Sequence, residues 1–329
     1  MPSDVLAVVS QSGPTITFLD ARHHDRLAVL ELPAEPHELL FDPDRRLLYA
    51  TITYKGGYYG ANAGPWHELV VVDPDRRAVV ETLDLSPEHA PHGMSLDRAR
   101  GLLYVSVEER ASARGGVVVL DTANREPVTR IDTGAAGPHW FVCTPDGTRG
   151  FAANKEAPFV SVVDLAQRRM IDRIPVQRSE GIAVTPDGAH VVVAAPPGVL
   201  VLDAATGRVL QELPVDGEVY PVHVTAAGEV LAGELRTASG ASTSVLGAQA
   251  PGRLHVHAAG GHELRGTVDV GRFPLTITSS PDGRRAYVSA VVESTVTVVD
   301  LERLTVLDTI TVDRAGEPGA HGLAYIPAA

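Results

Sequence analysis

The hydrophobic positions of this chain fall into short runs, in which apolar side chains either alternate with polar ones or fill the run, as in "LLYVSV" and "TVTVVD". Runs of this length, rich in Val, Leu and Ile, predict β-strands. The runs are separated by turn sequences such as "PDG" and "DAATG". In these turns Pro restricts φ and Gly tolerates a positive φ. Long helical periodicity is absent, so the pattern predicts an all-β fold.

The strand pattern repeats. The clearest copy spans residues 273–312 and contains four predicted strands. Four strands in roughly 40–55 residues is the period of a β-propeller blade. The other copies of the repeat lie at 35–85, 90–133, 137–176, 179–215 and 220–270.

The two ends of the chain complete one further blade. Residues 3–33 contain three predicted strands, and residues 320–329 contain one. Pairing them closes the ring and removes free sheet edges, where other chains could otherwise add. We therefore predict one seven-bladed propeller domain over residues 1–329, with four-stranded blades at about 35–86, 89–135, 137–178, 179–218, 220–271, 273–314, and 320–329 plus 3–33.

The repeat "PDGRRAYVSAVVESTVTVVDL" resembles the YVTN repeat of the lactonase-like seven-bladed propellers, and the resemblance extends over essentially the whole chain. It implies that the innermost strand of each blade begins on the face where the second strand ends. One residue per blade then stands at the mouth of the central channel. These residues are His37, His92, His139, Glu180, Tyr220, Leu275 and His321.

The histidines of this set come from four consecutive blades, because the seventh blade adjoins the first. Histidine titrates near neutral pH and can donate or accept a proton. A single histidine at such a position can be an ordinary component of the repeat, but four in neighbouring blades favour a functional site. We predict His37, His92, His139, His321, Glu180 and Tyr220 as catalytic residues.

The same histidines are also candidate metal ligands. Neutral imidazoles beside a carboxylate suit zinc, copper, nickel or iron. Ligands from separate blades are widely spaced, so two or three histidines can reach one ion more readily than all four. A divalent metal ion is the one cofactor that the sequence indicates, with ligands drawn from His37, His92, His139 and His321.

A second group of polar residues stands where the second strands end, on the same face. Arg and Lys suit a carboxylate or phosphate of a substrate. Two insertions, 54–68 and 236–253, follow second strands, and the first is rich in aromatic residues suited to a lid. Tolerated loop growth is the alternative reading of both insertions. The predicted substrate-binding residues are Lys155, Asn154, Arg236, Glu108, Glu234, Tyr54, Tyr58 and Trp66.

Composition limits the partners of the protein. A net charge of −13 argues against nucleic acid, which requires a basic surface. No run approaches the length of a membrane span, and the first residues lack the basic region of a signal peptide, so a cytoplasmic location is expected. The single cysteine, Cys143, excludes an intrachain disulfide. The oligomeric state is left open.

These features predict a small-molecule enzyme of lyase, lactonase, isomerase or cyclase type, suited to secondary metabolism, with its ligand at the channel mouth. The fold is similar to that of the streptogramin B lyases, whose catalytic histidine lies in a Pro-His-Gly motif. That role would fall here on His92 ("PHGM") or His321 ("AHGL"). The chain has "YVS" where those lyases favour "WFTE". A non-catalytic ligand- or protein-binding scaffold and a metal-redox protein are the alternatives.

Overall fold

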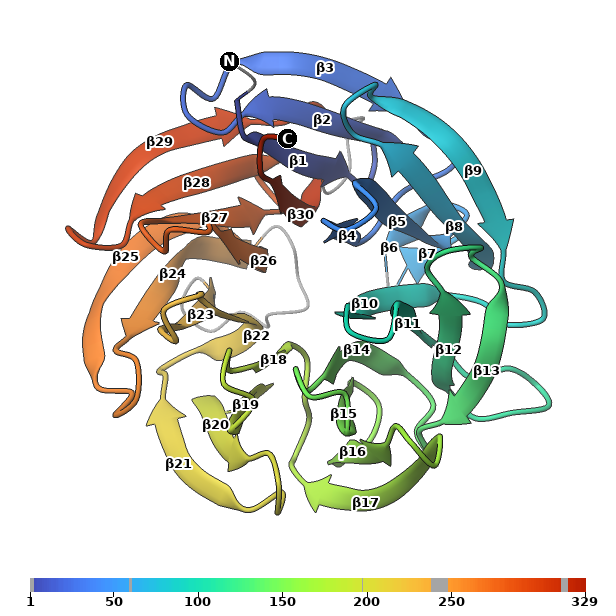
Figure 1. Cartoon of the computed structure of the whole chain (residues 1–329). Helices are drawn as coiled ribbons and strands as arrows, with labels where there is room; N and C mark the ends of the chain where they lie inside the picture. Colours follow the sequence, from blue (N-terminus) through green and yellow to red (C-terminus); the bar gives the residue numbers. More distant parts are fainter. Residues whose placement is uncertain (1–2, 59–60, 197, 238–247, 315–318) are drawn as a thin grey trace.

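The computed structural model describes residues 3–58, 61–196, 198–237, 248–314 and 319–329. Their strands form seven four-stranded antiparallel sheets arranged around a central axis (Figure 1). A small two-stranded sheet, β6 (Gly57–Tyr58) and β7 (Ala61–Asn62), accompanies the first blade. The predicted seven-bladed propeller is confirmed. The described part of the chain contains no helix with the length and hydropathy that a bilayer crossing requires.

Within each blade the first strand named below is the innermost. Blade 1 consists of β4 (Leu39–Asp42), β5 (Leu47–Tyr54), β8 (Pro65–Asp73) and β9 (Ala78–Asp84). Blade 2 consists of β10 (Pro91–Asp97), β11 (Leu102–Val107), β12 (Gly116–Asp121) and β13 (Pro127–Asp132). Blade 3 consists of β14 (Pro138–Cys143), β15 (Arg149–Asn154), β16 (Phe159–Asp164) and β17 (Arg169–Pro175).

The remaining blades follow the same order. Blade 4 consists of β18 (Ile182–Val184), β19 (His190–Ala195), β20 (Gly198–Asp203) and β21 (Val209–Pro214). Blade 5 consists of β22 (Glu218–Val224), β23 (Val230–Thr237), β24 (Gln249–His257) and β25 (Leu264–Arg272). Blade 6 consists of β26 (Pro274–Ser279), β27 (Arg285–Ala290), β28 (Thr295–Asp300) and β29 (Thr305–Thr311). Blade 7 consists of β30 (Ala320–Ile326), β1 (Val5–Ser10), β2 (Thr15–Asp20) and β3 (Arg26–Glu31).

The Pro-Asp-Gly turns join the first and second strands of three blades. In blade 3 the Thr144 hydroxyl donates a hydrogen bond of 2.6 Å to Asp146 Oδ1. Gly147 follows with a φ of 62°, a conformation that costs glycine little because it has no Cβ. The same hydroxyl-to-Asp bond recurs in blade 4, at Thr185 and Asp187, and in blade 6, at Ser280 and Asp282.

The hydrophobic core lies between the blades. Each pair of neighbouring blades shares one buried cluster among the described residues. Successive residues of a strand point to opposite faces of the sheet. On β27, accordingly, Tyr287 packs toward blade 7, whereas Ala286 and Val288 pack toward blade 5. Both faces of the second strand of each blade are therefore largely buried, which explains the long apolar runs of these strands.

Blade 7 is built from both ends of the chain, as predicted. Strand β30 pairs with β1, with Val5 opposite Ile326 and Val8 opposite Leu323. Its apolar residues enter two clusters, because Leu323 packs toward blade 6 and Ile326 packs toward blade 1. The Tyr325 hydroxyl also donates a hydrogen bond of 2.6 Å to the Asp4 carboxylate.

The strand register brings two sets of residues to one face. The beginning of the innermost strand lies opposite the end of the second strand, as in the pairs Pro91–Val107 and Pro138–Asn154. Residues just before or at the start of an innermost strand therefore lie beside residues just after a second strand. This is the face at which the candidate site is found.

Candidate functional site

Four histidines from adjoining blades lie in contact at the start of the innermost strands. We call His321, His37, His92 and His139, in that order, the histidine row. Successive ring centroids are 4.1, 5.0 and 4.6 Å apart. His92 is only 1 % exposed, and His321 and His37 are 4 % and 5 % exposed. The histidines that the repeat predicts at the channel mouth thus form one continuous group, in which three are buried and His139 is partly buried.

A bulge at the start of blade 1 positions two residues of this group. Thr51 accepts a hydrogen bond from the His37 amide through its carbonyl oxygen, and its own amide donates to the Glu38 carbonyl oxygen. His37 and Glu38 therefore both oppose Thr51, which is the arrangement of a β-bulge. The normal alternation of side chains is interrupted, and two successive side chains reach the same cluster. Glu180 and Gly181 oppose Ala194 in the same way in blade 4.

Gly322 allows blade 7 to approach blade 1 closely. Its amide donates a hydrogen bond of 3.1 Å to the His37 carbonyl oxygen. A Cβ at this position would lie 2.6 Å from that oxygen and 2.8 Å from the Glu38 Cα. Glycine after the histidine in "AHGL" is therefore needed to bring His321 beside His37.

Glu38 lies between the first two histidines of the row. Its Oε1 is 3.6 Å from His37 Nδ1 and 3.4 Å from His321 Nδ1. The residue is 1 % exposed. The repeat pattern does not predict Glu38, because strict strand alternation directs the residue after His37 away from the cluster. The available signal was that "PHEL" carries a glutamate where two of the other histidine motifs carry glycine.

His92 forms the most tightly connected part of the site. Its Nε2 is 2.9 Å from Glu108 Oε1, and the Tyr54 hydroxyl donates a hydrogen bond of 2.8 Å to the same oxygen. Burial acts to raise the pKa of Glu108, but the hydrogen bonds and the charge of His92 lower the pKa overall. An ionised Glu108 can accept a hydrogen bond from His92 Nε2–H, which orients the imidazole.

The last histidine of the row is followed by a carboxylate and an ammonium group. His139 Nδ1 lies 3.5 Å from Glu180 Oε2, and Lys155 Nζ lies 3.4 Å from Glu180 Oε1. The His139 side chain is 13 % exposed, more than the side chains of the other three histidines. This end of the row is therefore the most accessible to a ligand.

Tyr220 continues the arc beyond Lys155. The Lys155 ammonium lies 5.8 Å from the centre of its ring, and the Arg178 guanidinium lies 5.4 Å from it. Arg178 is also 3.0 Å from Glu218. Arg178 and Glu218 were not among the predicted residues, because they lie outside the two ring positions that the repeat defines.

Burial sets the protonation of the cluster. It lowers the pKa of His37 and of His139 well below the usual value, and neighbouring positive charges lower both further. For His321, burial first and then the charge of His92 lower the pKa to about 3. These imidazoles are therefore neutral at neutral pH. Burial also raises the pKa of Glu38 well above its usual value, and it raises that of Glu180 against the opposing charges of Lys155 and Arg178.

Several buried polar atoms of the histidine row and of Glu38 lack hydrogen-bond partners within the described part of the chain. This holds for Nδ1 of all four histidines and for Oε2 of Glu38. Each buried polar atom without a partner costs about 1–3 kcal/mol of stability. These five atoms, gathered in one cluster, make the row and Glu38 a candidate ligand site.

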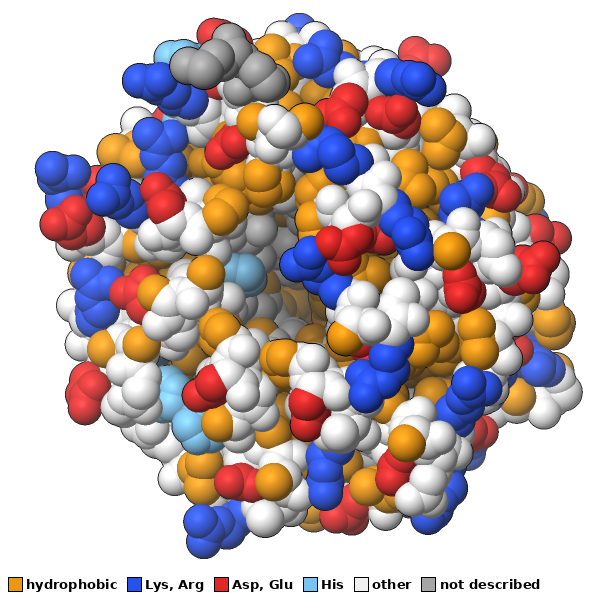
Figure 2. Space-filling view, viewed as in Figure 1, with side chains coloured by type: hydrophobic (Ala, Val, Ile, Leu, Met, Phe, Trp, Pro, Cys, Tyr) orange, Lys and Arg blue, Asp and Glu red, His pale blue; other side chains and the backbone are white. Residues whose placement is uncertain are grey.

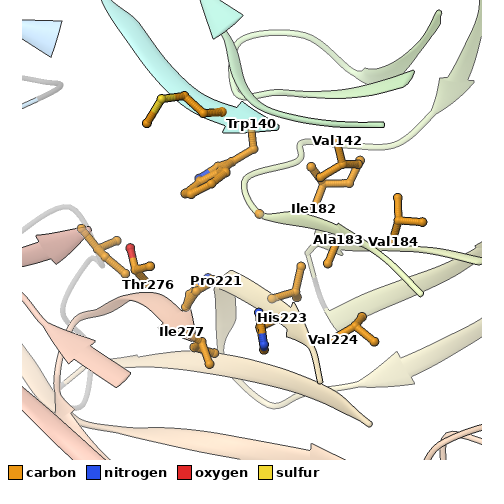
Figure 3. A pocket seen from close by; sticks show the side chains of 14 residues that line it. Trp140, Val142, Ile182, Ala183, Val184, Pro221, His223, Val224, Thr276 and Ile277 are labelled. Atoms are coloured by element: carbon orange, nitrogen blue, oxygen red, sulfur yellow. The ribbon is translucent and has the colours of Figure 1, made fainter. Parts of the chain in front are cut away.

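A cavity of about 290 Å³ occupies the central channel next to this group. Figure 2 shows a hollow at the centre of the ring, and Figure 3 shows the side chains around the cavity. Trp140 and Gly181, which directly follow His139 and Glu180, are among its lining residues. The lining is mainly apolar and includes Leu275, the one apolar residue predicted at the mouth. His223 supplies a polar atom, with its Nε2 2.9 Å from Ser279 Oγ, and burial lowers its pKa to about 4.

Three of the predicted substrate-binding residues make contacts within their own blades. The Asn154 side-chain amide donates to the Phe159 carbonyl oxygen and to Ser161 Oγ, at 2.8 and 2.9 Å. Glu234 Oε2 is 2.8 Å from His255 Nε2, and Arg236 donates to the Pro251 carbonyl oxygen. Glu234 and Arg236 border a second hollow between blades 4 and 5, which Glu218 also lines. Glu108 and Tyr54 thus contact His92 of the row and Lys155 contacts Glu180 beside it, whereas these side-chain hydrogen bonds of Asn154, Glu234 and Arg236 lie within their own blades.

The two predicted lids are only partly described. The amide of Gly57 donates a hydrogen bond to Glu35, so β6 is held near the start of blade 1. Trp66 lies at the start of β8, where its ring stacks on His67 and packs against the cluster between blades 7 and 1. The Tyr58 side chain and residues 238–247 of the second insertion lie outside the described residues. Whether either segment acts as a lid stays a prediction.

Comparison with known proteins identifies the fold but not the family. No family model matches the chain, and no curated protein matches it. Among solved structures it is similar to hydrazine synthase of Kuenenia stuttgartiensis, with a TM-score of 0.70 and 15 % sequence identity over 89 % of this chain and 96 % of that chain. At this identity the likeness extends to the propeller fold alone. The resemblance to YVTN and lactonase-like propellers stays a prediction.

Proposed function

We propose that this protein is an enzyme that binds a small, largely apolar organic molecule in its channel and acts on it by acid–base chemistry. The observation that supports this proposal most directly is the position of His139, Glu180 and Lys155. They stand at the accessible end of a buried histidine row, and the residues after His139 and Glu180 line the channel cavity. An apolar cavity with a few convergent polar groups is the usual form of a small-molecule site.

In this proposal some residues act on the ligand, and others hold the histidine row in position. His139 is a neutral imidazole that can remove a proton from the ligand, and Lys155 holds developing negative charge or a carboxylate. Behind them, Glu108 and Tyr54 fix the orientation of His92, which packs against the His139 ring. Removing a proton next to a carbonyl group is a step in many lyase, isomerase and cyclase reactions, and a neutral base could equally activate water on a lactone.

A second candidate function is binding without reaction. It is favoured by the cavity lining, which is mostly aliphatic and does not include the four histidines themselves. A ligand could occupy this space without touching the row. The experiment that tests the proposal must therefore separate binding from turnover.

The test is a screen of the purified protein against small lactones, β-substituted carbonyl compounds and isomerisable ketones, with products followed by mass spectrometry. We expect turnover of at least one class by the parent protein. Replacing Ala183 by Phe fills the cavity, so A183F should lose that turnover while its thermal midpoint stays close to that of the parent. Turnover retained by A183F would contradict a reaction in this cavity. Ligand binding with no product would support the second candidate.

A further inference from the structure

The donor atoms at the other end of the histidine row are spaced like ligands of one metal ion. One ring nitrogen of His37, one ring nitrogen of His321 and a carboxylate oxygen of Glu38 all lie within 4.8 Å of one another. The two nitrogen-to-oxygen distances of 3.6 and 3.4 Å exceed the usual 2.7–3.2 Å of a hydrogen bond. Ligands at 2.0–2.2 Å from a tetrahedral ion stand about 3.4 Å apart. The group thus fits an ion better than it fits mutual hydrogen bonding.

The chemistry of the three residues agrees with their spacing. Two neutral imidazoles and one carboxylate form the ligand set of many catalytic zinc sites, which keep a fourth position open. The same set with more open positions suits iron(II). Calcium and magnesium prefer oxygen ligands, so they fit it poorly. The Nδ1 atoms of His37 and His321 are buried and lack a hydrogen-bond partner within the described residues, as expected of atoms that serve as metal ligands.

The backbone holds these ligands in place before any ion arrives. The bulge opposite Thr51 directs both His37 and Glu38 to the cluster, and the amide of Gly322 ties His321 to the His37 carbonyl oxygen. A site assembled from rigid strands loses little conformational freedom when it binds its ligand. The ligands also come from the first and last blades, so an ion would link the two ends of the chain.

We propose that His37, His321 and Glu38 bind one divalent transition-metal ion, with zinc as the ion that the ligand set and spacing favour. His92 stands next to this site with its ring 5.0 Å from that of His37, outside the group of three. The site does not depend on the proposed enzyme activity, because a binding scaffold could hold the same ion.

The test uses the full chain freed of metal by a chelator and then titrated with Zn²⁺, with calorimetry giving stoichiometry and affinity. We expect one ion per chain and a rise in thermal midpoint on binding. Co²⁺ in place of Zn²⁺ should give the intense visible absorption of a tetrahedral site. The variants Glu38→Gln and His321→Ala should each bind at least about 10-fold more weakly.

The control and the conservative variant keep the test decisive. His257→Gln replaces a buried histidine on the third strand of blade 5 and should bind like the parent. Glu38→Gln keeps the shape of the side chain, so it reports on the site even if His321→Ala fails to fold. Tighter binding of Fe²⁺ than of Zn²⁺, lost in the same variants, would support the site with a different ion. Equal affinity in parent and Glu38→Gln, or no binding of Zn²⁺, Co²⁺, Fe²⁺ or Mn²⁺, would overturn the proposal.

Discussion

A chain that ends at residue 319 is expected to lose the cooperative unfolding of the parent. The truncation removes β30, the innermost strand of blade 7, and with it the ladder of hydrogen bonds to β1. It also removes Leu323 and Ile326, which fill clusters on opposite sides of the blade. Burying side chains of this size contributes about 1.5–3 kcal/mol each. Together with the lost ladder, this approaches the whole stability of an ordinary domain, about 5–15 kcal/mol.

Circular dichroism during denaturant and thermal unfolding measures this effect. Removing only the exposed Ala329 is the matched control, and it should leave the midpoint unchanged. We expect the 1–319 chain to aggregate or to unfold over a broad range, because the edge of β1 is exposed. A single sharp transition at the midpoint of the parent would show that β30 does not contribute to the stability of the propeller.

Replacing His139 by Gln is expected to reduce turnover of the screened compound by about 10²–10⁴-fold, the usual contribution of a positioned acid or base. Glutamine keeps a similar length and polarity but cannot take up a proton. The cavity beside Trp140 should stay open, so we expect kcat to fall with little change in KM.

His257→Gln provides the same chemical change outside the channel. Its kcat should equal that of the parent, because the His257 imidazole contacts the His262 carbonyl oxygen and not the histidine row. If His139→Gln retains the kcat of the parent, His139 is not the base, and the proposed mechanism is wrong at its first step. This result would leave the metal-site proposal untouched.

The fold was predictable because each blade repeats the same sequence pattern of strands and turns. Val-rich runs, Pro-Asp-Gly turns and the two incomplete ends of the chain all pointed to a closed ring of seven blades. The histidine row was predictable for the same reason, since one position of the repeat carries His37, His92, His139 and His321. The repeat defines which residues share a face, and neighbouring blades then place them side by side.

The partners of the row were harder to predict because they depend on local irregularity. Glu38 joins the cluster through a bulge, and a bulge has no clear signature in a single sequence. Arg178 reaches Tyr220 from the connection between blades 3 and 4 and pairs with Glu218 at the start of β22, and both residues lie outside the two positions that the repeat defines. Asn154 fits the predicted ring, yet its amide donates within its own blade, a choice that register alone does not reveal.

The central claim is that the buried histidines and glutamates are kept for a ligand and not for the fold. The free energy of unfolding of Glu38→Met, measured beside the parent in chelator, tests this most directly. Methionine has a similar shape and needs no partner, whereas Glu38 Oε2 has no hydrogen-bond partner among the described residues. We predict that the variant is as stable as the parent or more stable by about 1–3 kcal/mol. A loss of stability of that size would contradict the claim, because it would make the cluster a structural network.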